Sequence, residues 1–204
     1  MGRLFGTDGA RGVANTELTC ELAMSIGRAA AMVLIETAGK RPTVVIGKDT
    51  RASSDMLEAA LSAGLCSVGA DVLLLGVIPT PAVAYLVGKY QAAAGIMISA
   101  SHNPCEYNGI KLFDGNGYKL PDTLEAEIEA IVLDGKMAPP APLGGEVGRI
   151  LPPRPAVDDY VHHLLQAAPV ELRGMRIAVD CANGSASTTA RKLFSALGAD
   201  CVYI

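Results

Sequence analysis

Short apolar runs alternate with helical apolar stripes along the first 135 residues. The runs are rich in Val, Ile, Leu and Met, a composition typical of buried strands. The stripes repeat every three or four residues and predict amphipathic helices. The predicted strands cover residues 43–47, 71–75, 94–98 and 110–113, and the predicted helices cover 16–37, 53–69, a segment opening at 79–81, and 121–133.

This alternation predicts an α/β fold: a mostly parallel, mixed sheet with helices on both faces. Thr16 or Thr19 is a candidate cap for the first helix, Gly39 follows its end, and Ser53 and Ser54 are candidate caps for the second. In such sheets ligands collect at the carboxyl ends of the strands. Lys48, Arg51 and Ser101 follow predicted strands and are expected at that edge.

A proline-rich segment divides the chain. Residues 135–155 hold six prolines, with Gly144 and Gly145 between them, which predicts a linker or an extended strap. Beyond it the pattern predicts a helix over 157–167, a strand over 175–180, a helix over 185–197 and a strand from 200. This is one βαβ unit, which cannot cover its own sheet. We therefore expect a first domain over 1–150 and the start of a second over 151–204, within a longer protein.

Composition narrows the classes of function. The net charge of −4 argues against a nucleic-acid or acidic-membrane binder, because both need a basic surface. The five cysteines form no CxxC pair, which favours reduced thiols over disulfides or zinc. The start of the chain lacks a signal-peptide core, and no apolar run approaches the length of a membrane span. We expect a cytoplasmic protein.

Residues 95–119 concentrate the candidate chemistry. A buried strand runs into the polar cluster 99–104, and Asn108-Gly109 is predicted to form a tight turn before a return strand. This arrangement predicts that Ser101, His102 and Lys111 lie at the mouth of one hairpin-like unit. Neighbouring side chains in extended backbone point to opposite faces, so His102 is expected to point away from Ser101. An acyl-transferring serine is therefore disfavoured.

A serine that carries phosphate needs cations around it, because phosphoserine brings roughly −1.5 to −2 charge. Each candidate also has a plainer interpretation: Lys111 as a solvated strand lysine, Asn103 as part of an Asx turn, and the segment around Arg11 as an ordinary glycine turn. His162 and His163 are interpreted as surface residues of a helix. The candidate cations are Arg11, Lys48, Arg51 and Lys111.

Three motifs carry a resemblance to a known family. The runs FGTDGARG at 5–12, GIMISASHNP at 95–104 and NGIK at 108–111 closely resemble the α-D-phosphohexomutase superfamily, and within it the bacterial phosphoglucosamine mutases. The resemblance covers the whole chain, but less than half of the family's four-domain length. It implies that these residues are domain I and the opening of domain II of such an enzyme.

The resemblance also implies roles for individual residues. Ser101 would be the phosphorylated serine, His102 and Lys111 would serve the acid/base steps, and Arg11 would support the phosphoryl group. Mg²⁺ would bind an oxygen of the Ser101 phosphate together with three aspartates of a loop that does not occur in these residues. The further expected contacts to substrate or phosphate are Thr7, Asp8, Gly9, Arg51 and Asn103.

The implied reaction interconverts glucosamine 6-phosphate and glucosamine 1-phosphate through a 1,6-bisphosphate, with glucosamine (or glucose) 1,6-bisphosphate as activator. The partner is then a small sugar phosphate, and a homodimer is left open. Two other functions stay open: a serine-dependent sugar phosphatase and a non-catalytic sugar-phosphate-binding module. The 204 residues alone are expected to be inactive.

Overall fold

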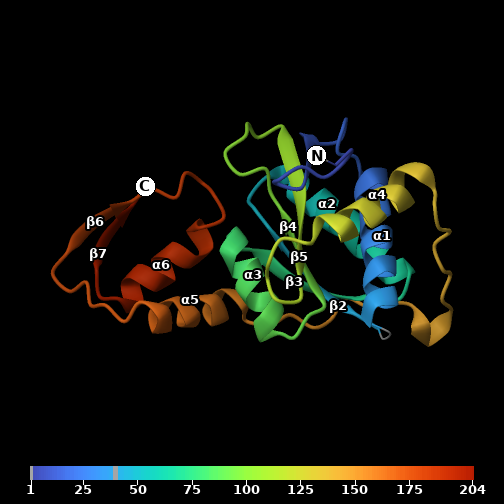
Figure 1. The fold of residues 1–204 in the computed structure, drawn as a ribbon. Helices are drawn as coiled ribbons and strands as arrows, with labels where there is room; N and C mark the ends of the chain where they lie inside the picture. The colour runs from blue at the N-terminus through green and yellow to red at the C-terminus, as the bar shows by residue number, and fades with distance from the viewer. Residues whose placement is uncertain (1, 39–40) are drawn as a thin grey trace.

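The computed structural model describes residues 2–38 and 41–204, and its larger part is a five-stranded mixed sheet (Figure 1). The strand order is β1-β5-β4-β2-β3. Strands β3, β2 and β4 are parallel, and β5 and β1 follow in antiparallel pairing. The bounds are β1 Ala10–Val13, β2 Thr43–Lys48, β3 Asp71–Val77, β4 Ala94–Ile98 and β5 Tyr107–Asp114.

Helices cover both faces of this sheet, as the alternating pattern predicts. Helices α1 (Cys20–Ala38), α2 (Ala52–Ser67) and α4 (Asp122–Asp134) lie on one face, where Ile26, Leu61 and Ile128 are buried in the larger core cluster. Helix α3 (Thr80–Lys89) covers the other face through a second core cluster. Burial of these apolar side chains supplies the main driving force for folding. The predicted fold class is confirmed.

The proline-rich segment is an extended strap, as predicted. It contains the short 3₁₀ helix η1 (Gly144–Glu146) and runs along the outer edge of β3. Val72 exchanges backbone hydrogen bonds with the strap, donating to Arg149 at 2.8 Å and accepting from Leu151 at 2.8 Å. Arg41 donates to the carbonyls of Gly145 and Val147. The strap therefore covers a strand edge that would otherwise be open to pairing.

The predicted βαβ unit is also present. Strands β6 (Arg176–Val179) and β7 (Asp200–Tyr203) pair in parallel and are joined by α6 (Ser187–Ala196). Helix α5 (Ala156–Ala167) precedes them and packs against α3. The prediction that both histidines of α5 are surface residues is wrong for one of them. His162 is exposed, whereas His163 is half-buried and stacks on Tyr85 with ring centroids 3.8 Å apart.

The cap predicted for the first helix is confirmed at Thr19, whereas the caps predicted for the second helix are wrong. Helix α1 begins at Cys20, where Thr19 Oγ accepts the Leu22 N–H at 3.2 Å, so Thr19 is the cap and Thr16 precedes the helix. Ser53 and Ser54 lie inside α2, and both hydroxyls accept hydrogen bonds from Asn108. Gly39, expected just past the first helix, lies outside the described residues.

The predicted turn at Asn108-Gly109 is wrong. Both residues lie within β5 and are buried, and the chain reverses earlier, between Ser101 and Glu106. Antiparallel pairing with β1 explains the difference, because Gly12 and Arg11 face Asn108 and Gly109 across the sheet. Strand β1 was not predicted, since four residues that include a glycine carry too little periodicity.

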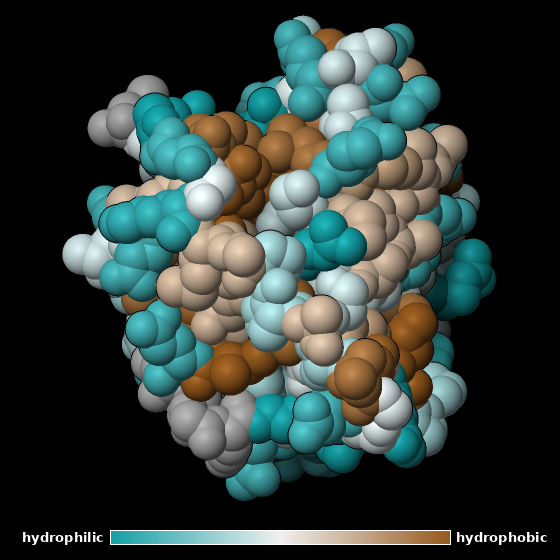
Figure 2. Space-filling view, turned by 90° about the vertical axis from the view of Figure 1, so that its right-hand side faces the viewer, coloured by the Kyte–Doolittle hydropathy of each residue, from teal (hydrophilic) through white to brown (hydrophobic). Residues whose placement is uncertain are grey.

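Among the described helices, none combines the length and apolarity needed to cross a bilayer. Figure 2 shows the right-hand side of Figure 1, where hydrophobic patches are bordered by hydrophilic residues.

Candidate active site

The loop between β4 and β5, residues 99–106, carries Ser101 at the carboxyl end of β4. Ser101 is exposed and has a positive φ of 57°, a left-handed conformation that is uncommon for a residue other than glycine. Its N–H donates to Ser99 Oγ at 3.0 Å. The Ser101 hydroxyl is thus presented to solvent on a loop with a defined, strained backbone.

The Ser101 hydroxyl faces the neighbouring imidazole. Ser101 Oγ lies 3.3 Å from His102 Nδ1, so the prediction that His102 points away is wrong. That prediction assumed extended backbone, and the left-handed conformation of Ser101 removes the alternation of side chains. His102 is exposed, and its ring can exchange a proton with an oxygen at position 101.

Sheet register places Arg11 and Lys111 near one another. Arg11 pairs with Gly109 across β1 and β5, and Lys111 is two residues further along β5, so the two side chains share a sheet face. Ser99 N–H donates to the Gly109 carbonyl at 2.9 Å, which brings the start of the Ser101 loop to the same position. The register therefore puts both cations on one face of the sheet, where Lys111 Nζ lies 5.8 Å from the centroid of the Phe113 ring. That both cations reach the Ser101 loop stays a prediction.

Thr7, Asp8 and Gly9 form a tight turn that leads into β1. The N–H and carbonyl groups of Gly6 and Gly9 bond reciprocally at 3.1 Å, and Thr7 and Asp8 are exposed at the tip. Gly9 has a φ of 88°, and a Cβ there would lie 2.3 Å from the Ile110 carbonyl oxygen. Only glycine lets this turn lie against the backbone of β5. Asp8 also pairs with Arg11 at 3.5 Å.

Arg51 does not present free donors to a ligand. Its side chain is 10% exposed, and Nε donates to Asp49 at 2.9 Å. Nη1 and Nη2 donate to three carbonyls of the Ser101 loop, those of Ser101 (3.0 Å), Asn103 (2.8 Å) and Pro104 (2.6 Å), and to the carbonyl of Tyr107 (3.0 Å) at the start of β5. With its donors occupied, direct phosphate binding by Arg51 is not supported. Asn103 is likewise held here through its backbone carbonyl.

Lys48 is occupied as well. Its ammonium lies 2.7 Å from Asp55 and 2.5 Å from Glu58, both on α2. Burial lowers the pKa of Lys48, but hydrogen bonds with Asp55 and Glu58 outweigh it and leave the pKa above its ordinary value. Lys48 therefore neutralises a buried carboxylate rather than facing the Ser101 loop, contrary to its candidacy as a phosphate cation.

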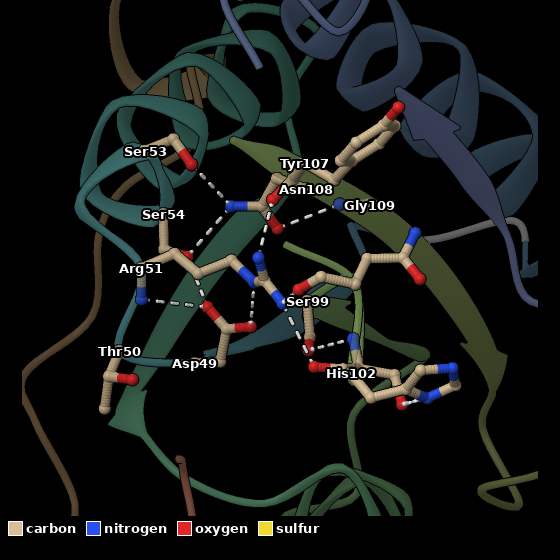
Figure 3. Close-up of polar contacts among 12 residues, drawn as sticks. Asp49, Thr50, Arg51, Ser53, Ser54, Ser99, His102, Tyr107, Asn108 and Gly109 are labelled. Carbon is tan, nitrogen blue, oxygen red and sulfur yellow. Dashed lines mark hydrogen bonds and ion pairs between the residues drawn. The ribbon is translucent and has the colours of Figure 1, made fainter. Parts of the chain in front are cut away.

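Sequence reasoning missed the residues that support this loop (Figure 3). Asp49 accepts from the backbone and side chain of Arg51 and from Ser54 Oγ at 2.8 Å. Ser54 in turn accepts from Asn108 Nδ2 at 3.0 Å. Asp49 follows the end of β2 directly, which is a signal for a polar role at that edge. Asn108 is buried because β5 pairs with its neighbouring strands, and nothing in the sequence around it indicated this role.

No group of three His, Cys, Asp or Glu side chains that could hold a metal ion occurs within residues 2–38 and 41–204. The unmodified Ser101 hydroxyl is a weak ligand for Mg²⁺, which prefers carboxylate and phosphate oxygens. The described residues therefore do not form a Mg²⁺ site by themselves.

Comparison with known proteins identifies the family. Residues 2–138 match the family model "Phosphoglucomutase/phosphomannomutase, alpha/beta/alpha domain I". The chain belongs to this phosphohexomutase family. Two curated phosphoglucosamine mutases, from Clostridium novyi (strain NT) and Desulforamulus reducens, are 55% and 54% identical over 204 residues. Each match covers 100% of this chain but only 45% and 46% of those relatives.

Solved structures of phosphohexomutases share the fold. A phosphoglucomutase/phosphomannomutase family protein from Burkholderia thailandensis superposes with a TM-score of 0.82 at 27% identity, covering 98% of this chain and 43% of that one. A putative phosphomannomutase from Thermus thermophilus gives 0.80 at 28%, covering 98% and 45%. The chain thus spans less than half the length of these phosphohexomutases. The family match ends at residue 138, and a domain boundary at 150 remains a prediction.

Proposed function

We propose that these residues are the first part of a phosphoglucosamine mutase, which interconverts glucosamine 6-phosphate and glucosamine 1-phosphate. One observation carries the proposal: an exposed serine with left-handed backbone sits at the carboxyl end of β4 beside an imidazole, in a chain 53–55% identical to proteins of that name. Arg11 and Lys111 share a face of the sheet, and two cations on the face beside the serine would favour phosphate over acyl chemistry.

The reaction consists of two phosphoryl transfers. The bond between phosphorus and the Ser101 oxygen breaks as a bond to the free sugar hydroxyl oxygen forms, and the hydroxyl proton passes to a base. The product of this step is a 1,6-bisphosphate. After it reorients, its other phosphate returns to Ser101 in the reverse sense. Glucosamine (or glucose) 1,6-bisphosphate would supply the first phosphoryl group to an unphosphorylated enzyme.

The proposed roles follow from chemistry and position. Lys111 and His102 exchange protons with the sugar hydroxyl and with the Ser101 oxygen, and Arg11 neutralises phosphoryl charge. In-line positioning and charge neutralisation supply most of the catalysis of phosphoryl transfer. Thr7, Asp8, Gly9 and Asn103 remain proposed contacts to substrate or phosphate.

Mg²⁺ would neutralise charge on the phosphoryl group when bound. These residues offer it one ligand only, an oxygen of the Ser101 phosphate, and we propose that aspartates outside this chain complete the site. A cytoplasmic location, a small sugar phosphate as partner, the absence of nucleic-acid and membrane partners, and a homodimeric assembly remain predictions from the sequence.

The decisive experiment uses the longer protein that contains this chain. Wild type, Ser101→Ala and the exposed-helix control Ser195→Ala are incubated with glucosamine 6-phosphate and a catalytic amount of the 1,6-bisphosphate. Isomer formation and free phosphate are followed by phosphorus NMR, and the phosphorylated residue is mapped by mass spectrometry.

We expect wild type and Ser195→Ala to form glucosamine 1-phosphate with phosphate on Ser101. Ser101→Ala should lose at least about a thousandfold in rate, because the group that carries the phosphoryl is gone. Release of inorganic phosphate without isomer would identify a phosphatase. Binding of the sugar phosphate without turnover by wild type would identify a binding module.

A further inference from the structure

The guanidinium of Arg51 spans the whole loop that carries Ser101. Its two terminal nitrogens contact carbonyls from both ends of the loop, at Ser101 and at Tyr107, with Asn103 and Pro104 between them. The planar guanidinium fixes the directions of these hydrogen bonds relative to one another. One side chain therefore sets the shape of seven consecutive residues.

The side chain and backbone of Arg51 are themselves held by Asp49. Asp49, 8% exposed, accepts from Nε and from the backbone N–H of Arg51. Ser54, fully buried, links Asp49 to Asn108 of β5. Figure 3 shows this network joining the end of β2, the first turn of α2 and the start of β5. The loop is thus tied to two strands and a helix rather than only to its own two ends.

The same network holds the strained residue. The N–H of Ser101 donates to Ser99 Oγ, and its carbonyl accepts from Arg51, so the peptide groups on both sides of Ser101 are fixed. A left-handed conformation at a non-glycine residue is energetically unfavourable and persists only where the surroundings impose it. Because that conformation turns the Ser101 hydroxyl toward His102, the contacts of Arg51 determine where the hydroxyl lies.

We propose that Arg51 is a positioning residue for phosphoryl transfer: it holds the Ser101 loop in the orientation that transfer requires and does not touch the phosphate. This inference rests on the proposed function. Lysine cannot replace it. An ammonium donates at most three hydrogen bonds from a single atom, so at least two of the five acceptors now bound would lose their partner.

The test compares Arg51→Lys with Arg41→Lys in the longer protein. Arg41 is a matched control, because its guanidinium also bonds to loop carbonyls and to an aspartate, Asp71. It does so at the opposite end of β2. For each variant kcat and KM for the sugar phosphate, the melting temperature and hydrogen exchange of amides 99–107 are measured. Asp49→Asn, which keeps the shape but removes the charge, is the second variant should Arg51→Lys not fold.

We expect kcat of Arg51→Lys to fall about a hundredfold, since a displacement of 1 Å at the reacting atom has that effect. KM of this variant should change less than about twofold, and its amide hydrogen exchange should become faster only in residues 99–107. Arg41→Lys should keep wild-type kcat, and Asp49→Asn should change kcat in the direction of Arg51→Lys by a smaller factor.

A kcat loss that only tracks the unfolded fraction, or a wild-type kcat in folded Arg51→Lys, would overturn the inference. So would an increase in KM with unchanged kcat, which would mean that Arg51 binds substrate. If wild type forms no isomer at all, it is the proposed function that fails, whatever the exchange data show.

Discussion

At the residue scale, the packing of the Ser101 loop depends on the lack of a side chain at Gly109. Gly109 pairs with Arg11 across the sheet and accepts the Ser99 N–H. A Cβ at position 109 would lie 2.7 Å from the Ser99 carbonyl oxygen and 2.9 Å from Arg11 Cγ. The missing side chain is what allows the stem of Arg11 to cross the sheet beside the loop.

Gly109→Ala should therefore disturb both partners. The contact with the Ser99 carbonyl involves backbone, which cannot move aside as a flexible side chain can. We expect a loss of about 1–3 kcal/mol in unfolding free energy from overpacking. We also expect turnover of the longer protein to fall about tenfold or more from displacement of the loop. Urea denaturation and steady-state kinetics measure the two effects.

Gly88→Ala is the control for that substitution. Gly88 lies in α3, and a Cβ there meets nothing within 4 Å. Replacing a helical glycine with alanine stabilises by about 0.5–1 kcal/mol, so this variant should gain stability and keep its activity. Equal activities in the two variants would show that close packing at Gly109 is not needed by the loop.

At the element scale, α4 anchors the segment that precedes β1. Glu129 is buried and accepts three backbone N–H groups, from Arg3 at 3.1 Å, Leu4 at 2.7 Å and Phe5 at 2.8 Å. Burial raises the pKa of Glu129, but these three hydrogen bonds outweigh it and leave the pKa below its ordinary value. The carboxylate is thus the acceptor for a segment that has no strand partner of its own.

Glu129→Gln should destabilise the protein by about 1–3 kcal/mol at pH 7, because one of the two acceptor oxygens becomes a donor facing an N–H. The depressed pKa gives the sign of the pH effect. The contribution of the carboxylate is complete above the ordinary glutamate pKa, about 4.3, and is lost as the pH falls through the lower folded-state value. The stability difference between wild type and variant should therefore shrink below about pH 4.

Glu127→Gln, an exposed position on the same helix, is the matched control and should leave stability unchanged within about 0.5 kcal/mol. Denaturation curves of the three proteins between pH 3 and 7 make the comparison. A difference between wild type and Glu129→Gln that stays constant across this range would contradict the assignment of the acceptor as a carboxylate.

At the scale of the whole molecule, the five-stranded sheet with its helices contacts the smaller unit that contains β6, α6 and β7. The five-stranded sheet is covered on both faces, whereas β6 and β7 form a two-stranded sheet in which neither strand is buried. Contacts between the units include Thr188 Oγ1 donating to the Val77 carbonyl at 3.1 Å and Thr50 Oγ1 donating to the Asn183 carbonyl. These hydrogen bonds connect the second unit to the first.

We expect residues 1–204 alone to fold around the larger sheet but to catalyse no mutase turnover. The described residues hold no acidic metal cluster, and the match to relatives covers less than half of their length. Circular dichroism and a cooperative melt would establish folding, and a coupled assay with protein free of host enzyme would measure turnover. Isomerisation by the purified 204 residues, lost on Ser101→Ala, would contradict this expectation.

The periodicity of the chain predicts its larger elements because a helix or strand with one buried face leaves a repeating signature. The α1 stripe was found in this way, whereas the β2 run was found from its continuous apolar residues and the strap from its prolines. Elements without such a signature were missed or misplaced. Strand β1 is four residues long, and Asn108-Gly109 forms part of β5 although the same dipeptide favours a turn in isolation.

The sequence by itself determined the α/β class, because that class depends on local pattern. It also predicted Ser101 as the phosphorylated serine, through a long contiguous motif, and the carboxyl ends of the strands as the place of the chemistry. Only the tertiary structure decided which cations lie open and which are occupied. Lys48 ends β2 and Arg51 comes three residues later, and both are neutralised by side chains within ten residues of them. Whether the donors of Lys48 and Arg51 meet acceptors depends on how α2 and the Ser101 loop pack together. The order of residues does not give the distances between these groups.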